Sequence, residues 1–227
     1  MMSNTKKRWF DVTLPCELAA LADKMLKNQF NEDIGTGFIV KVSTPNSLKG
    51  RYIITETTSR IVENAYGHAQ ELEQKNQSIY RFSFSSNQPL SLEIIDPPRS
   101  LGRFTKILSE FLGLGFSLSS VSIDVMAWLS EIEKKCAPVE VTHIKYSNIN
   151  IANKGIASLS VKSSQDIRYE ANKLIKNRNH QIDSVKFRNK DLLSITINRS
   201  GTVILPIASI NEINEIIYEA ALRSRIS

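Results

Sequence analysis

The stretch IDSVKFRNKDLLSITINRSGTVILP, residues 182–206, decides how the C-terminal half of the chain folds. Short apolar alternations separated by polar, glycine-containing turns are typical of consecutive strands in an antiparallel sheet. We predict three strands here, over residues 182–188, 192–198 and 202–207. Ser200-Gly201 makes the tight turn between the last two strands, because glycine tolerates the positive φ that such turns require.

Successive side chains of a strand point to opposite faces of its sheet, so these strands predict one apolar and one polar face. The apolar set comprises Val185, Phe187, Leu193, Ile195 and Ile197. The polar set comprises Lys186, Arg188, Ser194, Thr196 and Asn198. Such a face could follow a phosphate backbone, or it could be the solvated side of a one-sided sheet.

The flanking segments add strands and helices to this sheet. Residues 139–145 and 155–161 are strand-like, and an Asn-rich stretch, 147–153, separates them. Ser163 and Asp166 form a capping-box pattern before a helical stripe that reaches Ile175. Ser209 and Glu212 form a second capping box before a C-terminal helix. The C-terminal half is therefore expected to combine strands and helices.

The order strand, helix, three strands, helix over residues 155–223 resembles one half of the saddle fold of the TATA-binding protein. The resemblance is carried by residues 195–205, ITINRSGTVIL, and by the helix that follows around residues 212–221. It implies a curved sheet with an exposed face. The chain has no phenylalanine pairs placed to wedge between base steps, which that family uses to kink DNA, and no second matching half upstream. TATA-box recognition is therefore not implied.

The N-terminal half alternates helices with strand pairs. We predict helices over residues 14–29, 59–74 and 100–112, and strands over 38–42, 52–57, 79–84 and 90–95. Residues 116–135 fit a strand or a helix, and we favour a short strand to Asp124 followed by a helix to Lys135. The break Cys136-Ala137-Pro138 divides the chain into an N-terminal α+β domain, 1–137, and a basic C-terminal α+β domain, 138–227. Each is expected to hold an antiparallel or mixed sheet with helices mainly on one face.

The positive charge is concentrated at the C-terminal end. The chain has 227 residues with 29 basic and 23 acidic side chains, a net of +6. Residues 138–227 hold 13 basic and eight acidic side chains, a net of +5. A cluster of this kind attracts polyanions, and salt weakens the attraction. The predicted nucleic-acid-binding residues are Lys173, Lys176, Arg178, Lys186, Arg188, Lys190 and Arg199.

Known catalytic patterns are missing from the sequence. The pairs Gly35-Thr36-Gly37 and Gly113-Leu114-Gly115 lack the third glycine and the lysine of phosphate-binding loops. The two cysteines are not spaced for zinc or for a disulfide scaffold. Three carboxylates at strand ends, Glu93, Asp96 and Asp124, resemble nuclease ligands, although loop capping accounts better for Asp96. Of the histidines, His143 is expected to be structural and hydrogen-bonded, and His180 could add to polyanion contact at low pH.

These observations favour a non-enzymatic accessory protein that binds DNA, RNA or another polyanion through its basic C-terminal half. The alternative is a protein–protein interaction subunit of a larger assembly with no direct nucleic-acid contact. We expect no cofactor, no metal and no membrane association, and a cytoplasmic location. The aromatic pair Trp9-Phe10 beside Lys6-Lys7-Arg8 is expected to dock on the body of the protein or on another subunit.

Overall fold

The fold comes from a computed structural model that describes residues 3–63, 69–86, 89–136, 138–151, 155–176, 178–189, 193–207 and 212–226. The described helices are α1 (Leu18–Lys27), α2 (Gly102–Leu112), α3 (Val125–Lys135), α4 (Arg168–Ile175) and α5 (Glu212–Arg223). The strands are β1 (Asn4–Thr13), β2 (Thr36–Thr44), β3 (Ser47–Glu63), β4 (Ala69–Ser85), β5 (Leu92–Ile95), β6 (Ser117–Ser120), β7 (Glu140–Ile151), β8 (Gly155–Lys162), β9 (Gln181–Arg188), β10 (Ser194–Asn198) and β11 (Thr202–Pro206). The helices accompany antiparallel strands, which confirms the predicted α+β class.

Contacts between residues group the chain into two compact units. One unit comprises residues 13–117, and the other combines residues 1–12 with residues 118–227. The boundary expected near residue 137 falls inside the second unit, between α3 and β7. The two units are called unit 13–117 and the two-segment unit.

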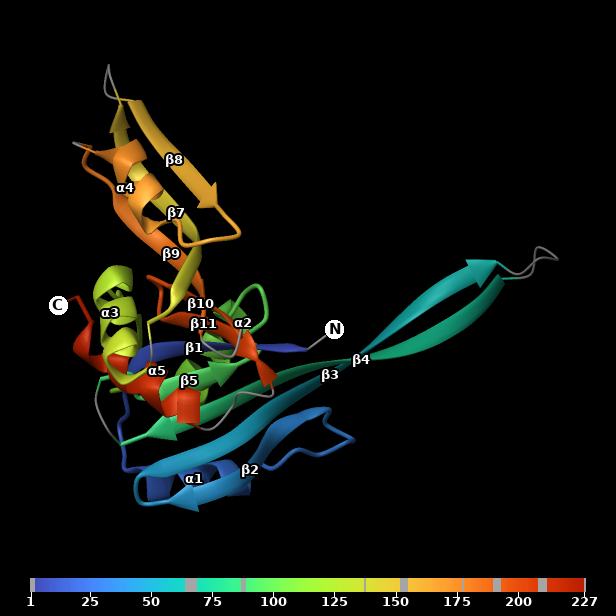
Figure 1. The fold of residues 1–227 in the computed structure, drawn as a ribbon. Coiled ribbons are helices and arrows are strands. Elements are labelled where there is room, and N and C mark those ends of the chain that lie inside the picture. The colour runs from blue at the N-terminus through green and yellow to red at the C-terminus, as the bar shows by residue number, and fades with distance from the viewer. Residues whose placement is uncertain are drawn as a thin grey trace. The chain divides into compact units, whose positions relative to one another are not determined.

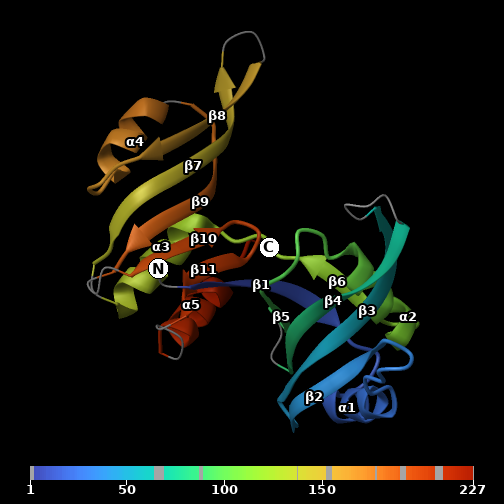
Figure 2. The ribbon, with the colours of Figure 1, turned by 90° about the vertical axis from the view of Figure 1, so that its right-hand side faces the viewer.

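Unit 13–117 is built on the sheet β2-β3-β4-β5, and Figure 2 shows α1 and α2 on the same side of it. An aromatic cluster fixes α2 to the sheet, because the Phe104 ring stacks on Tyr80 at a centroid distance of 4.8 Å and Phe111 lies 4.7 Å from Phe38. Phe104 and Phe38 are almost completely buried. The apolar side of each helix therefore packs into the core, as its helical periodicity predicts.

The predicted helix over residues 59–74 is wrong. Residues 59–63 belong to β3 and residues 69–74 to β4, and the two strands pair from Ser47↔Ser85 out to Glu63↔Ala69. The many β-branched residues in 53–62 favour a strand over a helix in this segment, since such side chains favour extended backbone. The outer part of this hairpin, residues 56–63 and 69–77, extends beyond the strands that flank its base (Figure 1). We call it the β3–β4 ribbon.

The two-segment unit is built on the sheet β1-β11-β10-β9-β7-β8, in which neighbouring strands are antiparallel. Strand β1 was not predicted, because its pairing with β11 joins residues about 200 positions apart, with Lys6 opposite Ile204. Trp9 and Phe10 are only 2% and 3% exposed. The Trp9 ring lies 6.0 Å from Trp128 of α3 and 5.8 Å from Tyr218 of α5, so the tryptophan docks on its own unit.

Helices α3, α4 and α5 cover one face of this sheet (Figure 2). Buried Trp128 ties α3 to α5, because its indole Nε1 donates a 2.9 Å hydrogen bond to the Ile217 carbonyl. The strand-then-helix interpretation of residues 116–135 is confirmed by β6 and α3. Asp124 starts α3 because its carboxylate accepts the backbone N–H groups of Met126 and Ala127.

The turns show one confirmed prediction and two errors. Gly201 has φ +66°, and a Cβ there would lie 2.2 Å from a Val121 methyl, so glycine is required. Strand β7 continues to Ile151, although its Asn-rich end predicted a loop. The predicted capping box at Ser163 does not form: α4 begins at Arg168, and the Asp166 carboxylate accepts the Val141 N–H instead of returning to Ser163. The capping box at Ser209 lies outside the described residues.

Candidate nucleic-acid interface

A row of side chains crosses the sheet of the two-segment unit on the face opposite the apolar core. The strand registers place its members directly opposite one another in the order Lys6, Ile204, Thr196, Lys186, His143 and Lys162. Directly opposed residues of antiparallel strands point to the same face. With strands about 4.8 Å apart, the five spacings span about 24 Å. Lys145 and Arg188 lie on the same face two residues from His143 and Lys186.

We call Lys6, Lys145, Lys162, Lys186 and Arg188, together with His143, the basic sheet face. The four lysines are exposed, and Arg188 and His143 are partly exposed. Alternation within β9 and β10 produces this face, because Val185, Phe187, Ile195 and Ile197 are at most 1% exposed on the other side. The predicted two-faced sheet is therefore confirmed.

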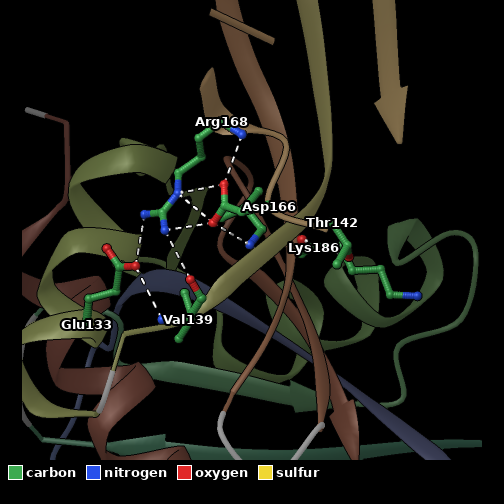
Figure 3. A network of polar contacts seen from close by, with 7 residues as sticks. Glu133, Val139, Thr142, Asp166, Arg168 and Lys186 are labelled. Carbon is green, nitrogen blue, oxygen red and sulfur yellow. Dashed lines mark hydrogen bonds and ion pairs between the residues drawn. The ribbon is translucent and has the colours of Figure 1, made fainter. Parts of the chain in front are cut away.

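Charges on the opposite side of the sheet serve a different purpose. The Arg168 guanidinium lies 2.9 Å from the Glu133 carboxylate and 2.8 Å from Asp166, and it donates a 3.0 Å hydrogen bond to the Val139 carbonyl. Burial opposes ionisation of Asp166, but hydrogen bonds from Arg168 and from the Val141 N–H outweigh it and lower the pKa of that carboxyl. Lys186 points away from this network (Figure 3). Arg168 is thus engaged in structure and is no part of the basic sheet face.

A hollow of about 250 Å³ opens in the basic sheet face. A register shift between Val141 and His143 places Thr142 beside the hollow, where its hydroxyl donates to the Lys186 carbonyl at 3.4 Å. Within the described part of the chain, the buried Ser194 Oγ has no hydrogen-bond partner. The lining consists of Thr142, His143, Lys162, Ser163, Lys186, Arg188 and Ser194. Cations and hydroxyl groups are the side chains that hold phosphate oxygens in nucleic-acid complexes.

His143 is hydrogen-bonded, as predicted, since its Nε2 lies 2.7 Å from the Ser160 Oγ. Its pKa is nevertheless lowered, first by burial and then by the charges of Lys162, Lys145 and Lys186. Burial has the larger effect, and the three lysines, which come from three strands, act in the same direction. His143 is therefore neutral near pH 7 in the free protein.

One acidic side chain borders this region. Glu140 lies directly opposite Arg188 across the β7–β9 pair, and its carboxylate is 3.8 Å from the guanidinium. Both side chains are about 40% exposed, so the pair contributes little to stability. A phosphate group could compete with Glu140 for Arg188.

The structure brings together only some of the predicted binding residues. Lys186 and Arg188 share the basic sheet face, whereas Lys173 and Lys176 are exposed at the end of α4 and Arg178 is exposed in the loop before β9. Strand β9 runs from Gln181 to Arg188, so at about 3.3 Å per residue its two ends lie about 23 Å apart, and Arg178 precedes the end that is farther from Arg188. Lys190 lies outside the described residues.

Arg199 occupies the turn between β10 and β11, at the end of β10 farther from Arg188. Its Nε donates to the Ser122 hydroxyl at 3.2 Å, and its backbone N–H donates to the Asp183 carbonyl at 2.8 Å. The side chain is partly buried in a second hollow that also includes Asp183. Arg199 is therefore held in the turn by protein contacts.

Sequence reasoning missed Lys6, Lys145 and Lys162 as members of the site. In residues 140–146 and 155–162, side chains alternate between the two faces of the sheet, which puts Lys145 and Lys162 on the face away from their apolar neighbours. This alternation could have identified both lysines. Lys6 has no such signal, because only the pairing of β1 with β11 brings it to this sheet.

The other candidate residues have structural explanations or lie outside the description. Asp124 caps α3, and Asp96 pairs with Arg81 at 3.3 Å. His180 contacts the Arg178 carbonyl through its Nδ1 at 2.8 Å, and His68 lies outside the described residues. Within the described ranges, no cluster of three metal-ligating side chains occurs, and no helix has the length and apolar content to span a bilayer.

Comparison with known proteins adds no assignment to this geometry. No protein-family model matches the chain, and no curated protein matches it.

Proposed function

We propose that this chain is a non-enzymatic accessory protein that binds nucleic acid through the basic sheet face. The observation that carries the proposal is the row from Lys6 to Lys162, in which three lysines and a histidine from four different strands face the same way over about 24 Å. That length corresponds to about seven nucleotide steps of 3.4 Å each. Lys145 and Arg188 widen the positive strip on either side of it.

Two features favour a polyanion over a small anionic metabolite. The cations are spread along a line, and exposed lysines, Lys162 and Lys186, form part of the lining of the hollow. A line of separated cations suits a ligand with repeated phosphates, because each phosphate can be neutralised by a separate side chain. Lys173, Lys176, Arg178 and Arg199 remain predicted contacts outside this strip, and Lys190, which is not among the described residues, remains a predicted contact. A cytoplasmic location is part of the same proposal.

The experiment is a gel shift with duplex and single-stranded DNA and RNA at two ionic strengths. We expect retention of at least one of these nucleic acids at low salt, with a steep loss at high salt. Reversal of two face charges, Lys186→Glu with Arg188→Glu, is expected to abolish retention while thermal unfolding stays cooperative. Retention unchanged by the reversal would overturn the assignment to this face.

A second function, as an interaction subunit of a protein assembly, is favoured by a different feature. Every described side chain of the β3–β4 ribbon is exposed, including Ile61 at 75% and Val62 at 38%. Strand edges with exposed apolar side chains are sites for pairing with another chain. This second function replaces the first if the wild-type protein retains no nucleic acid and if removal of the ribbon abolishes binding of a protein partner.

A further inference from the structure

The part of the basic sheet face formed by β9, β7 and β8 is arranged differently from the rest. His143 stands between Lys162 on β8 and Lys186 on β9, each directly opposite it in register. Lys145 lies two residues farther along β7, on the same face. The lining of the hollow contains Lys162, Lys186 and Arg188, three hydroxyl groups and no carboxylate. This surrounding is suited to a group with several negatively charged oxygens.

We propose that the hollow holds a phosphate group and that binding there takes up a proton at His143. The proposal rests on the proposed function, since it identifies where on the basic sheet face a phosphate is held and what controls its affinity. It also adds a property that a solvated lysine surface lacks, namely affinity that depends on pH in the range where lysine and arginine do not titrate.

The groups that face His143 explain why it is neutral without a ligand. Lys145 on its own strand, Lys162 on β8 and Lys186 on β9 all carry positive charge, while Ser160 on β8 is neutral. Arg188 and Glu140 form an ion pair farther along the same face and largely balance each other. Burial and the three lysines both oppose a fourth positive charge, so the His143 pKa lies below its usual value.

A phosphate in the hollow reverses this balance. Its negative charge offsets the lysines and favours the imidazolium form, so binding raises the pKa of His143 and draws a proton from solvent. The contact with Ser160 survives the change, because a hydroxyl donates to neutral Nε2 and accepts from protonated Nε2. Protonation therefore adds a cation to the site without breaking the hydrogen bond that positions the ring.

The sign of the effect follows from linkage. Affinity is expected to rise as pH falls, by up to tenfold per pH unit between the pKa of His143 with ligand and its lower pKa without ligand. Above the higher of these values the affinity becomes independent of pH. The variant His143→Gln keeps a side chain able to hydrogen-bond Ser160 but cannot take up the proton, so its affinity is expected to be flat across the same range.

The test combines binding and titration on the full chain. Affinity for a fluorescent oligonucleotide is measured between about pH 5.5 and pH 8, for wild type, His143→Gln and the matched control His180→Gln, which removes a described histidine outside the hollow. In parallel, the NMR titration of the His143 ring is followed free, with inorganic phosphate and with the oligonucleotide. We expect a raised His143 pKa with oligonucleotide and a pH-dependent affinity that only His143→Gln removes.

The outcomes separate this inference from the proposed function. Oligonucleotide binding at unchanged His143 pKa, with the same pH dependence in His143→Gln, overturns the inference and leaves nucleic-acid binding intact. A His143 pKa raised by inorganic phosphate without binding of any oligonucleotide supports the phosphate site and overturns the nucleic-acid function. If the oligonucleotide raises the pKa and inorganic phosphate does not, the phosphate that the hollow accepts is one held in a polymer.

Discussion

Neutralising the two lysines that flank His143 on the basic sheet face should change the salt dependence of nucleic-acid binding by a calculable amount. The variant is Lys162→Gln with Lys186→Gln, which removes two exposed charges on either side of His143 and keeps side chains of similar length. Each phosphate contact contributes about 0.9 to the slope of log affinity against log salt for duplex DNA, and about 0.7 for single strands. The slope is therefore expected to fall by about 1.8 for a duplex or about 1.4 for a single strand.

The magnitude is large enough to measure by fluorescence anisotropy. Over a fourfold rise in salt, from about 50 to about 200 mM, a slope difference of 1.8 means that the wild type loses about twelvefold more affinity for a duplex than the variant does. All five lysine and arginine side chains of the face together allow a slope of at most about 4.5. Both lysines are exposed, so the melting temperature is expected to stay unchanged.

Two companion variants decide how the result is interpreted. Lys24→Gln with Lys41→Gln removes the same charge from exposed positions in unit 13–117 and should leave the slope unchanged. Lys173→Gln with Lys176→Gln tests the predicted contacts on α4. Equal slopes for the face variant and the Lys24/Lys41 control would refute the reasoning, because net charge alone would then account for binding.

Three further predictions concern stability. Replacing residues 57–75 by Asn-Gly joins the paired residues Glu56 and Asn76 through a two-residue turn. The free energy of unfolding should change by less than about 0.5 kcal/mol, because the removed side chains that the structure describes are exposed. A large loss of unfolding free energy in chemical denaturation would show that the ribbon packs on other parts of the protein. Tyr146→Phe should stabilise the protein by about 1 kcal/mol, since the buried hydroxyl has no hydrogen-bond partner among the described residues; a lower denaturation midpoint would contradict this. Asp166→Asn should lower the melting temperature at pH 7, and the gap should narrow as pH falls below about 4, because a carboxyl whose pKa is lowered by folding stabilises above its unfolded pKa and loses that contribution as pH falls toward its folded pKa. A gap that does not narrow below about pH 4 would count against the role of its charge.

The helix predicted over residues 59–74 shows where local pattern fails. Its apolar spacing fits a helix, yet residues 59–63 pair with residues 69–73 as strands. The ribbon is held by backbone pairing that continues outward from a buried base, where Tyr52 lies opposite Tyr80 and Gly50 opposite Phe82. That base forms only when the sheet of unit 13–117 assembles, so the apolar spacing within residues 59–74 does not by itself reveal the pairing.

The sequence by itself determined the α+β class, the two faces of β9 and β10 and the glycine turn at Gly201, because each depends on side-chain alternation or backbone preference within a few residues. It also located Lys186 and Arg188, whose direction follows from their own strand. Only the tertiary structure decided that Lys6, His143 and Lys162 lie in line with Lys186, and that Arg178 lies at the other end of β9. Register between strands is set by the packing of a whole sheet, and residues more than 150 positions apart become neighbours only through it.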